Sequence, residues 1–186
     1  MTFGASLEAL RAGGVIACPT ETLVGLLADA HCHSAIERIM SIKGRAAHQP
    51  IALLIPDFAM LGEVAEDLTP IGSVLARQHW PGPLTLVVVA KRGLHPALLQ
   101  DGKVGIRIPG RSPALDIVQA FGGPLTATSA NLSGQPAVSS TAMLEPGVRS
   151  AVDYVIEGAA DLALPSTVVD VSGEMPVLLR QGALRV

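Results

Sequence analysis

Short continuous apolar runs follow one another along this 186-residue chain and alternate with amphipathic or polar segments. Such runs predict buried strands, and they lie at residues 15–18, 51–55, 84–90, 104–108, 125–128, 154–156, 167–171 and 177–179. Only a few residues around Ser172-Gly173-Glu174 separate the last two runs, which predicts a hairpin. Because apolar strands alternate with helical segments, the pattern predicts an α/β fold with a mixed parallel and antiparallel sheet flanked by helices.

Helix start and stop signals stand between these runs. A first helix is expected over residues 6–12, closed by Gly13-Gly14. Side chains suited to accept hydrogen bonds from a first helical turn predict further starts at Ser34, Asp57, Thr69 and Ser112. The first of these helices is expected to stop at Gly44 and the last at Gly122-Gly123. The chain has neither an internal repeat nor a linker, so one domain over residues 1–186 is expected.

Composition narrows the functional class. Apolar residues make up 49% of the chain and charged residues 16%, which excludes a disordered or acidic low-complexity protein. Aromatic residues make up only 3% of the chain, so few side chains are available to stack on nucleobases. The net charge of −3, without a basic run, predicts that direct RNA binding is weak or absent. Most of the cations are arginines, which suit a small local phosphate site.

The cysteine content and the apolar runs bear on the cellular compartment. Cys18 and Cys32 are too few to build a disulfide framework. The first residues lack the basic and apolar regions of a signal peptide, and the longest apolar runs are far shorter than a membrane span. A cytoplasmic protein without membrane association is therefore expected.

Familiar catalytic motifs are absent from the sequence. It contains no GxxxxGK[ST] loop, no GxGxxG after a strand, and no HExxH, CxxC or GxSxG. His31-Cys32-His33 would suit a zinc ion, but no third ligand is identifiable, and the false-positive risk of short motifs favours a polar loop before a helix. A Ser-His-Asp triad stays open, because its members are assembled in space.

Four polar segments follow or flank the predicted strands, where ligands of open α/β sheets bind. They are Pro19-Thr20-Glu21-Thr22, Lys43-Gly44-Arg45, Ser129-Ala130-Asn131 and Arg180-Gln181-Gly182. Each has a plainer interpretation, as charges at a helix C-terminus or as turn-forming side chains. Together, two cations, a serine–asparagine loop and a further arginine supply what a polyphosphate ligand needs. Their spacing does not say which polyphosphate.

Seven sequence words extend this picture over nearly the whole chain. They are CPTETLVGL (18–26), KGR (43–45), WPGPLTLVV (80–88), VGIRIP (104–109), TSANLSGQPA (128–137), PSTVVD (165–170) and LRQG (179–182). In these words and their order the chain resembles the threonylcarbamoyl-AMP synthases, in the single-domain YrdC form related to Sua5. The paired KxR and SxN words are that family's hallmark. Since little follows LRQG, we expect the short form without the additional C-terminal domain of Sua5.

This resemblance implies a YrdC/RibB-like fold, a twisted mixed sheet around a large concave cavity. It implies synthesis of L-threonylcarbamoyl-AMP and pyrophosphate from L-threonine, bicarbonate and ATP, with Mg²⁺ on the phosphates. The product would pass to a separate tRNA threonylcarbamoyl transferase complex for t6A modification at adenosine 37. The implied nucleotide site consists of Lys43, Arg45, Gln49, Asn131, Ser139 and Arg180, with Lys43 and Arg45 as the catalytic cations. The implied L-threonine pocket consists of Thr22, Arg107, Ser129 and Ser166.

The chain departs from the family pattern at three positions. Val24 stands where family members commonly have an aromatic residue, Ala46 where they have proline, and Gln49 where asparagine is common. Val24 is expected near the threonine pocket, so the departure bears on amino-acid specificity. Three alternatives stay open: a YciO-like paralogue with a different acceptor, the carbamoyl-transfer domain of hydrogenase maturation proteins, and an RNA-binding module. The maturation proteins carry that domain inside a much longer chain, which argues against them.

Overall fold

A computed structural model describes residues 3–44 and 49–185. Its helices are α1 (Gly4–Arg11), α2 (His33–Ile42), α3 (Leu61–Val64), α4 (Pro70–His79), α5 (Pro113–Phe121) and α6 (Pro146–Ala151), with 3₁₀ turns at Pro96–Leu98 and Thr141–Met143. Its strands are β1 (Ile16–Pro19), β2 (Val24–Leu27), β3 (Ala52–Leu54), β4 (Leu84–Val89), β5 (Leu99–Gln100), β6 (Lys103–Arg107), β7 (Leu125–Ser129), β8 (Tyr154–Val155), β9 (Thr167–Asp170) and β10 (Val177–Arg180).

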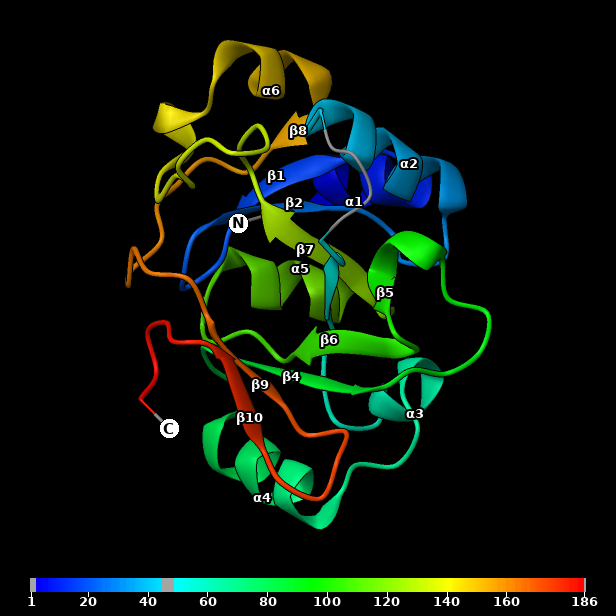
Figure 1. Cartoon of the computed structure of the whole chain (residues 1–186). Coiled ribbons are helices and arrows are strands. Elements are labelled where there is room, and N and C mark those ends of the chain that lie inside the picture. Colours follow the sequence, from blue (N-terminus) through cyan, green and yellow to red (C-terminus); the bar gives the residue numbers. More distant parts are fainter. Residues whose placement is uncertain (1–2, 45–48, 186) are drawn as a thin grey trace.

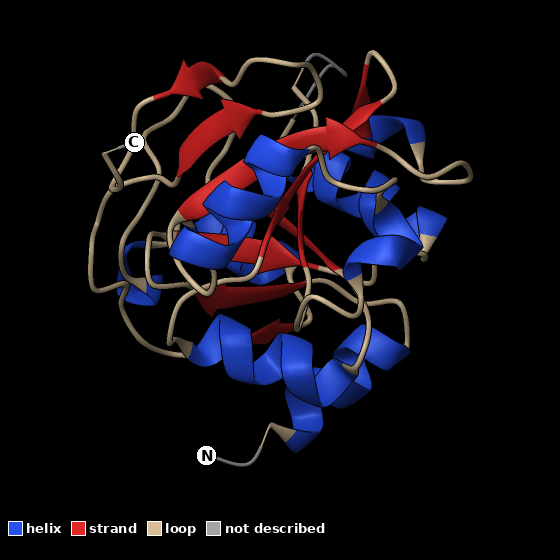
Figure 2. Ribbon diagram, turned by 90° about the horizontal axis from the view of Figure 1, so that it is seen from below, coloured by secondary structure: helices blue, strands red, loops and turns tan. Residues whose placement is uncertain are grey.

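These strands form one mixed sheet in the order β10-β9-β4-β6-β3-β7-β2-β1-β8, with β5 paired to β6. The pairs β1–β8, β3–β6 and β4–β9 are parallel, and the other neighbours are antiparallel. In Figure 1, α4 and the β9–β10 hairpin lie at the bottom of the view, while α6, β8 and α2 lie at the top. Figure 2 shows helices on more than one side of the strands. The expected mixed α/β sheet and the final hairpin are confirmed.

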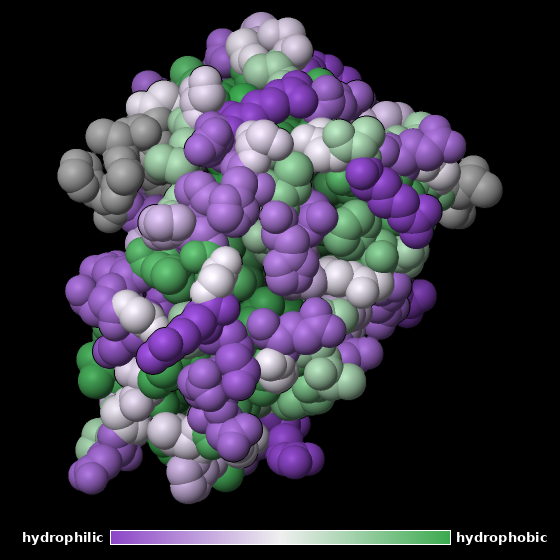
Figure 3. Space-filling view, turned by 90° about the vertical axis from the view of Figure 1, so that its right-hand side faces the viewer, coloured by the Kyte–Doolittle hydropathy of each residue, from purple (hydrophilic) through white to green (hydrophobic). Residues whose placement is uncertain are grey.

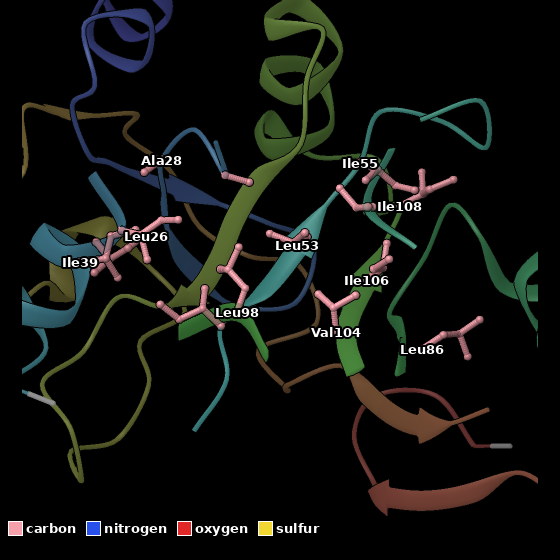
Figure 4. Close-up of a cluster of buried hydrophobic side chains, with 14 of the residues drawn as sticks. Leu26, Ala28, Ile39, Leu53, Ile55, Leu86, Leu98, Val104, Ile106 and Ile108 are labelled. Atoms are coloured by element: carbon pink, nitrogen blue, oxygen red, sulfur yellow. The ribbon is translucent and has the colours of Figure 1, made fainter. Parts of the chain in front are cut away.

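The alternation of side chains along the strands builds two cores on opposite faces of the sheet. Leu26 of β2 and Leu53 of β3 belong to the larger core, which α2 covers through Ile36 and Ile39. The neighbouring residues Leu27 and Leu54 belong to a second core, which α1 and α5 cover. Figure 4 shows side chains of the larger core converging from separate strands.

The second face of the sheet also carries the cavity described below. In β6, Val104 and Ile106 enter the larger core, whereas Lys103, Gly105 and Arg107 line the cavity. The neighbouring strands β4 and β9 alternate in the same way. The sheet therefore separates the core from the cavity, and every second residue of these strands is placed to contact a ligand.

Helix ends follow the predicted caps in two cases and differ in two. Thr69 Oγ1 accepts a hydrogen bond from Gly72 N at 3.1 Å at the start of α4, and Ser112 Oγ accepts one from Leu115 N at 3.4 Å at the start of α5. The cap at Ser34 is wrong, because α2 begins at His33 and Ser34 lies inside it. Asp57 Oδ1 accepts hydrogen bonds from the backbone of residues 59 and 60 in a turn before α3. It does not cap α3, whose N-cap residue is Met60.

The sequence pattern also predicted neither the two-residue strand β5 nor helix α6. It did not predict β2 either. The four residues of β2 contain Gly25 and come directly after the polar turn at 20–23, so they are too short to register as an independent run. Elsewhere the predicted strands agree with the observed ones to within one or two residues. Within the described ranges, no helix has the length and apolar character needed to cross a bilayer.

Candidate nucleotide and amino-acid cavity

A cavity of about 680 Å³ lies on the second face of the sheet. Its floor consists of small residues, Gly25, Ala52, Gly105 and Ala127, which stand on four neighbouring strands. A Cβ atom at Gly105 would lie 3.3 Å from Thr85 Cγ2 and 3.4 Å from Ala52 Cβ, so a larger residue there would fill the floor. Polar side chains surround this floor, and they form the groups described next.

The first group centres on Arg107, at the end of β6. Its guanidinium Nη1 donates hydrogen bonds to Glu21 Oε1 at 2.8 Å and to Thr22 Oγ1 at 3.1 Å. Both charged side chains are buried, with exposed fractions of 7% for Arg107 and 8% for Glu21. Thr22 Oγ1 is also 2.7 Å from Thr20 Oγ1, which donates to the Leu23 carbonyl at 2.8 Å. The turn between β1 and β2 thus fixes the position of an arginine on a distant strand.

The second group centres on Arg180, the last residue of β10. Its Nε donates to the Ser166 carbonyl at 3.0 Å, and its Nη2 donates to Ser166 Oγ at 3.1 Å. Ser166 Oγ is in turn 2.8 Å from Thr85 Oγ1 on β4. Two hydroxyl groups and one arginine are therefore joined along the cavity wall.

The third group holds Lys43, the residue that follows α2. Its Nζ donates to the Ser129 carbonyl at 2.5 Å, to the Asn131 carbonyl at 2.9 Å and to Asn131 Oδ1 at 3.4 Å. Asn131 Nδ2 donates to the carbonyls of Leu132 and Gln135, which orders the loop after β7. These contacts join the ammonium at the end of α2 to the loop that follows β7.

A fourth group lies further along the cavity. Lys103 Nζ donates to Asp170 Oδ2 at 2.9 Å, and Asp170 Oδ1 accepts bonds from the backbone and the hydroxyl of Ser172. Burial opposes ionisation of Asp170, but the hydrogen bonds from Lys103 and Ser172 outweigh it and lower the pKa of this carboxyl. Gln100 and Asp101 line the same end of the cavity.

The electrostatics of the first two groups favour an anion. Burial lowers the pKa of Arg107, the Glu21 carboxylate partly offsets this, and the nearby charge of Arg180 lowers it further. Burial also lowers the pKa of Arg180. An arginine stays charged in proteins. Arg107 pairs with Glu21, whereas Arg180 donates hydrogen bonds to the carbonyl and hydroxyl of Ser166, so this part of the cavity suits a carboxylate or phosphate group of a ligand.

Most of the expected site residues line this one cavity. The residues that do so are Thr22, Gln49, Arg107, Ser129, Ser166 and Arg180. Lys43 and Asn131 lie directly behind the wall at Ser129. Ser139 is not among the lining residues, and its carbonyl accepts a hydrogen bond from Ala160 N. Arg45 and Ala46 lie outside the described residues.

Two further expectations concern Val24 and the histidines. Val24 is among the residues that line the cavity, but its side chain is fully buried and belongs to the larger core. His31 lies in the turn before α2 and His33 begins that helix, which agrees with the polar-loop interpretation. The described residues include no group of three or more His, Cys, Asp or Glu side chains placed to hold a metal ion.

Three residues that line the cavity, Thr85, Lys103 and Asp170, were not expected from the sequence. Glu21, which pairs with Arg107 without lining the cavity, was not expected either. Glu21 belongs to a predicted polar segment but was given no role there. Lys103 had a usable signal, because polar or small residues alternate with Val104 and Ile106 over residues 103–107. Thr85 and Asp170 each interrupt an apolar run, and the sequence does not show that the two runs pair.

Residues 8–182 match the model of the Sua5/YciO/YrdC family, which is described as telomere recombination. The chain belongs to the Sua5/YciO/YrdC family. Threonylcarbamoyl-AMP synthase of Pyrococcus abyssi is 35% identical over 178 residues, which cover 94% of this chain and 52% of that protein. The chain spans about half the length of this relative and of the Bacillus subtilis protein of the same name.

Two solved structures of this family share the fold. P. abyssi Sua5 complexed with L-threonine has a TM-score of 0.87 and 33% identity, covering 95% of this chain and 53% of that one. Escherichia coli YciO has a TM-score of 0.84 and 26% identity, covering 95% of this chain and 87% of that one. The mixed sheet of the Sua5/YciO/YrdC family is therefore the fold of this chain, as the resemblance implied.

Proposed function

We propose that this domain, residues 1–186, synthesises L-threonylcarbamoyl-AMP and pyrophosphate from L-threonine, bicarbonate and ATP. The observation that carries the proposal is the 680 Å³ cavity, in which Arg107 and Arg180 meet Thr22, Ser129 and Ser166. This combination of forked cations and hydroxyl groups suits an amino acid beside a nucleotide. The support from relatives is that P. abyssi Sua5, which shares the fold, was solved with L-threonine.

The amino-acid half of the site follows from Arg107 and its neighbours. The guanidinium would bind the carboxylate of L-threonine through two parallel hydrogen bonds. The hydroxyls of Thr22, Ser129 and Ser166 would contact the rest of the amino acid. The Thr85–Ser166–Arg180 chain places the serine hydroxyl beside the second arginine, so the amino acid and a phosphate would lie close together.

The nucleotide half would consist of Lys43, Arg45, Gln49, Asn131, Ser139 and Arg180. Lys43 would bring a positive charge from the end of α2, and Arg180 a second from the end of β10. Ser139 is the weakest member, since it is not among the residues that line the cavity. We expect Mg²⁺ to arrive on the ATP phosphates, which is the usual way this ion binds in nucleotide sites.

The reaction requires charge neutralisation more than a protein nucleophile. The threonine amine and bicarbonate form a carbamate with loss of water, and a carbamate oxygen then attacks the α-phosphorus of ATP while pyrophosphate leaves. Both reactants are anions, so cations from Lys43, Arg45 and Arg180 would lower the barrier to their approach. Positioning of the reactants would supply much of the remaining acceleration. A cavity set into the fold would limit attack of water on the labile anhydride.

We place this reaction in the cytoplasm, upstream of a tRNA threonylcarbamoyl transferase complex that would use the product for t6A modification. Cys18 and Cys32 are both unpaired, as expected in a reducing compartment. Direct RNA binding would be weak, because the net charge is −3. On the face shown in Figure 3, apolar residues reach the surface in scattered places between polar ones.

A second candidate is a YciO-like activity with an acceptor other than threonine. The observation in its favour is Val24, which lines the cavity where an aromatic residue is common in the synthases. The Val24 side chain is fully buried in the larger core, so the change from an aromatic residue would act on the acceptor through the packing of the pocket wall.

The deciding experiment is pyrophosphate release from ATP and bicarbonate with Mg²⁺, measured with L-threonine, with L-serine and with no amino acid. Release that needs both threonine and bicarbonate supports the synthase. Binding of ATP without threonine-dependent release contradicts it and favours the YciO-like candidate. The Val24→Tyr variant is the informative partner, because improved discrimination against serine would place residue 24 in the amino-acid pocket.

A further inference from the structure

The ion pair between Arg107 and Glu21 uses only one edge of the guanidinium. Nη1 has two N–H groups, and the structure directs one to Glu21 Oε1 and the other to Thr22 Oγ1. Nε and Nη2 have no partner among the described residues, although Arg107 lines the cavity. The N–H of Nε and one N–H of Nη2 are parallel and form a fork that matches a carboxylate.

The Glu21 carboxylate, the other member of this ion pair, is unusual because one of its two buried oxygens is unpaired within residues 3–44 and 49–185. Glu21 Oε2 is enclosed and has no hydrogen-bond partner within the described part of the chain. A two-pronged pairing, common between arginine and carboxylate, would satisfy this oxygen through a second guanidinium nitrogen. The fold instead leaves the oxygen unpaired, which is unfavourable. An arrangement that is costly for the free protein points to a requirement in the ligand-bound one.

Position 110 shows how closely the Glu21 side chain is confined. A Cβ atom at Gly110 would lie 3.0 Å from Glu21 Cγ and 3.2 Å from its Cδ. The missing side chain at 110 leaves the space that the carboxylate occupies. Glu21 is therefore held on one side by this backbone and on the other by Arg107.

We propose that Glu21 is a positioning residue, which holds Arg107 through Nη1 alone and so keeps the Nε–Nη2 fork free for the carboxylate of the amino-acid substrate. Glu21 does not line the cavity and would act through Arg107. Its negative charge also offsets part of the repulsion between Arg107 and Arg180. This inference rests on the proposed function, because it assigns the fork to the carboxylate of L-threonine.

The Glu21→Gln variant distinguishes this positioning role from a purely structural role of Glu21. Glutamine keeps the size and one oxygen acceptor but loses the charge, so the guanidinium is free to turn and is repelled by Arg180. We expect the KM for L-threonine to rise about tenfold, while kcat and the KM for ATP change less than about twofold. A purely structural role would instead lower activity toward both substrates together with the thermal midpoint.

Two further variants keep the test decisive if Glu21→Gln folds poorly. In an Arg107→Gln background, adding Glu21→Gln should change the KM for threonine by less than about twofold, because the group through which Glu21 acts is gone. Gly110→Ala leaves every charge in place but displaces the Glu21 side chain, and it should also raise the KM for threonine selectively. Additive effects of the two charge substitutions would overturn the proposal.

Binding measurements and a crystal structure distinguish failure of this inference from failure of the proposed function. A wild-type protein that releases no threonine-dependent pyrophosphate contradicts the function alone. The positioning role is then judged by calorimetric titration with L-threonine and by the crystal structure of the Glu21→Gln variant. Weakened threonine binding or a turned Arg107 supports it, and an unmoved guanidinium with unchanged binding overturns it.

Discussion

Ser129 illustrates how one cavity residue serves two purposes. Its backbone carbonyl accepts a hydrogen bond from Lys43 Nζ, which joins the end of α2 to the end of β7. Its side chain lines the cavity, where it is expected to contact the amino acid. The structural contact uses the main chain and the expected substrate contact uses the side chain, so a substitution separates the two.

Ser129→Ala should raise the KM for L-threonine roughly fivefold, equivalent to one neutral hydrogen bond of about 1 kcal/mol. The Kd for ATP and the thermal midpoint should stay unchanged, because the carbonyl that binds Lys43 remains. Steady-state kinetics with each substrate varied in turn measures the effect. Ser133→Ala, an exposed position in the same loop, is the matched control. Equal losses toward both substrates would place Ser129 on the nucleotide side.

Asp153 couples the stability of the protein to pH. Its Oδ2 accepts hydrogen bonds from Val15 N at 2.8 Å and Arg38 Nη1 at 2.5 Å. Burial opposes ionisation of this carboxyl, but the bonds from Arg38 and Val15 outweigh it and lower its pKa. Because the folded state prefers the ionised form, its contribution is present above the unfolded pKa of about 3.9 and is lost as the pH falls through the folded value.

Asp153→Asn should therefore lower the unfolding free energy at pH 7 and reduce its loss on acidification below about pH 4. Urea unfolding at several values between pH 7 and pH 3 measures both effects. Glu66→Gln, which removes an exposed ion pair with Lys91, is the control and should change stability very little. A variant curve parallel to the wild-type curve would mean that Asp153 does not supply this pH dependence.

At the scale of elements, the two ten-residue helices, α2 and α4, begin in different ways. Thr69 Oγ1 accepts from Gly72 N and also donates to the Val171 carbonyl at 2.9 Å, so it ties α4 to the chain after β9. No side-chain cap is present at the start of α2, whose first turn depends on packing of Ile36 and Ile39. Ser34 and Thr69 are similar cap signals in the sequence, but only Thr69 caps a helix in the structure.

Thr69→Ala should lower the unfolding free energy by about 1–2 kcal/mol, because both the cap and the bond to Val171 are lost. Ser34→Ala, at the position where a cap was expected but not found, should change it by less than about 0.5 kcal/mol. Urea denaturation of both variants gives the comparison. A larger loss at Ser34 than at Thr69 would contradict this view of the two helix starts.

At the scale of the molecule, the sheet divides a packed core from an open cavity. The strands β4, β6 and β9 send apolar side chains into the core on one face. Their residues on the other face line the cavity and include Val87 and Val168 beside small and polar ones. Gly105 stands at the centre of this division, since any side chain there would enter the cavity floor. The cavity volume thus depends on residues that carry no chemistry themselves.

Gly105→Val should raise the KM for both ATP and L-threonine more than tenfold while the far-ultraviolet circular dichroism stays that of the wild type. Valine suits a strand, but its methyl groups would occupy the cavity floor beside Thr85 and Ala52. Kinetics and equilibrium binding check this expectation. Gly62→Val is the control, because a Cβ atom there meets nothing within 4 Å. Unchanged binding would mean that substrates do not reach this floor.

The apolar pattern by itself determined the fold class, most strands and the final hairpin. A strand buried in a sheet shows in the sequence as a run of alternating or continuous apolar residues. The polar segments at 19–22, 129–131 and 180–182 were visible for the same reason, since each ends an apolar run. Only the tertiary structure decided the strand order, the face on which each residue lies and the pairing of Glu21 with Arg107. Those two residues are 86 positions apart, and contacts at such separations follow from strand pairing, which no local pattern records.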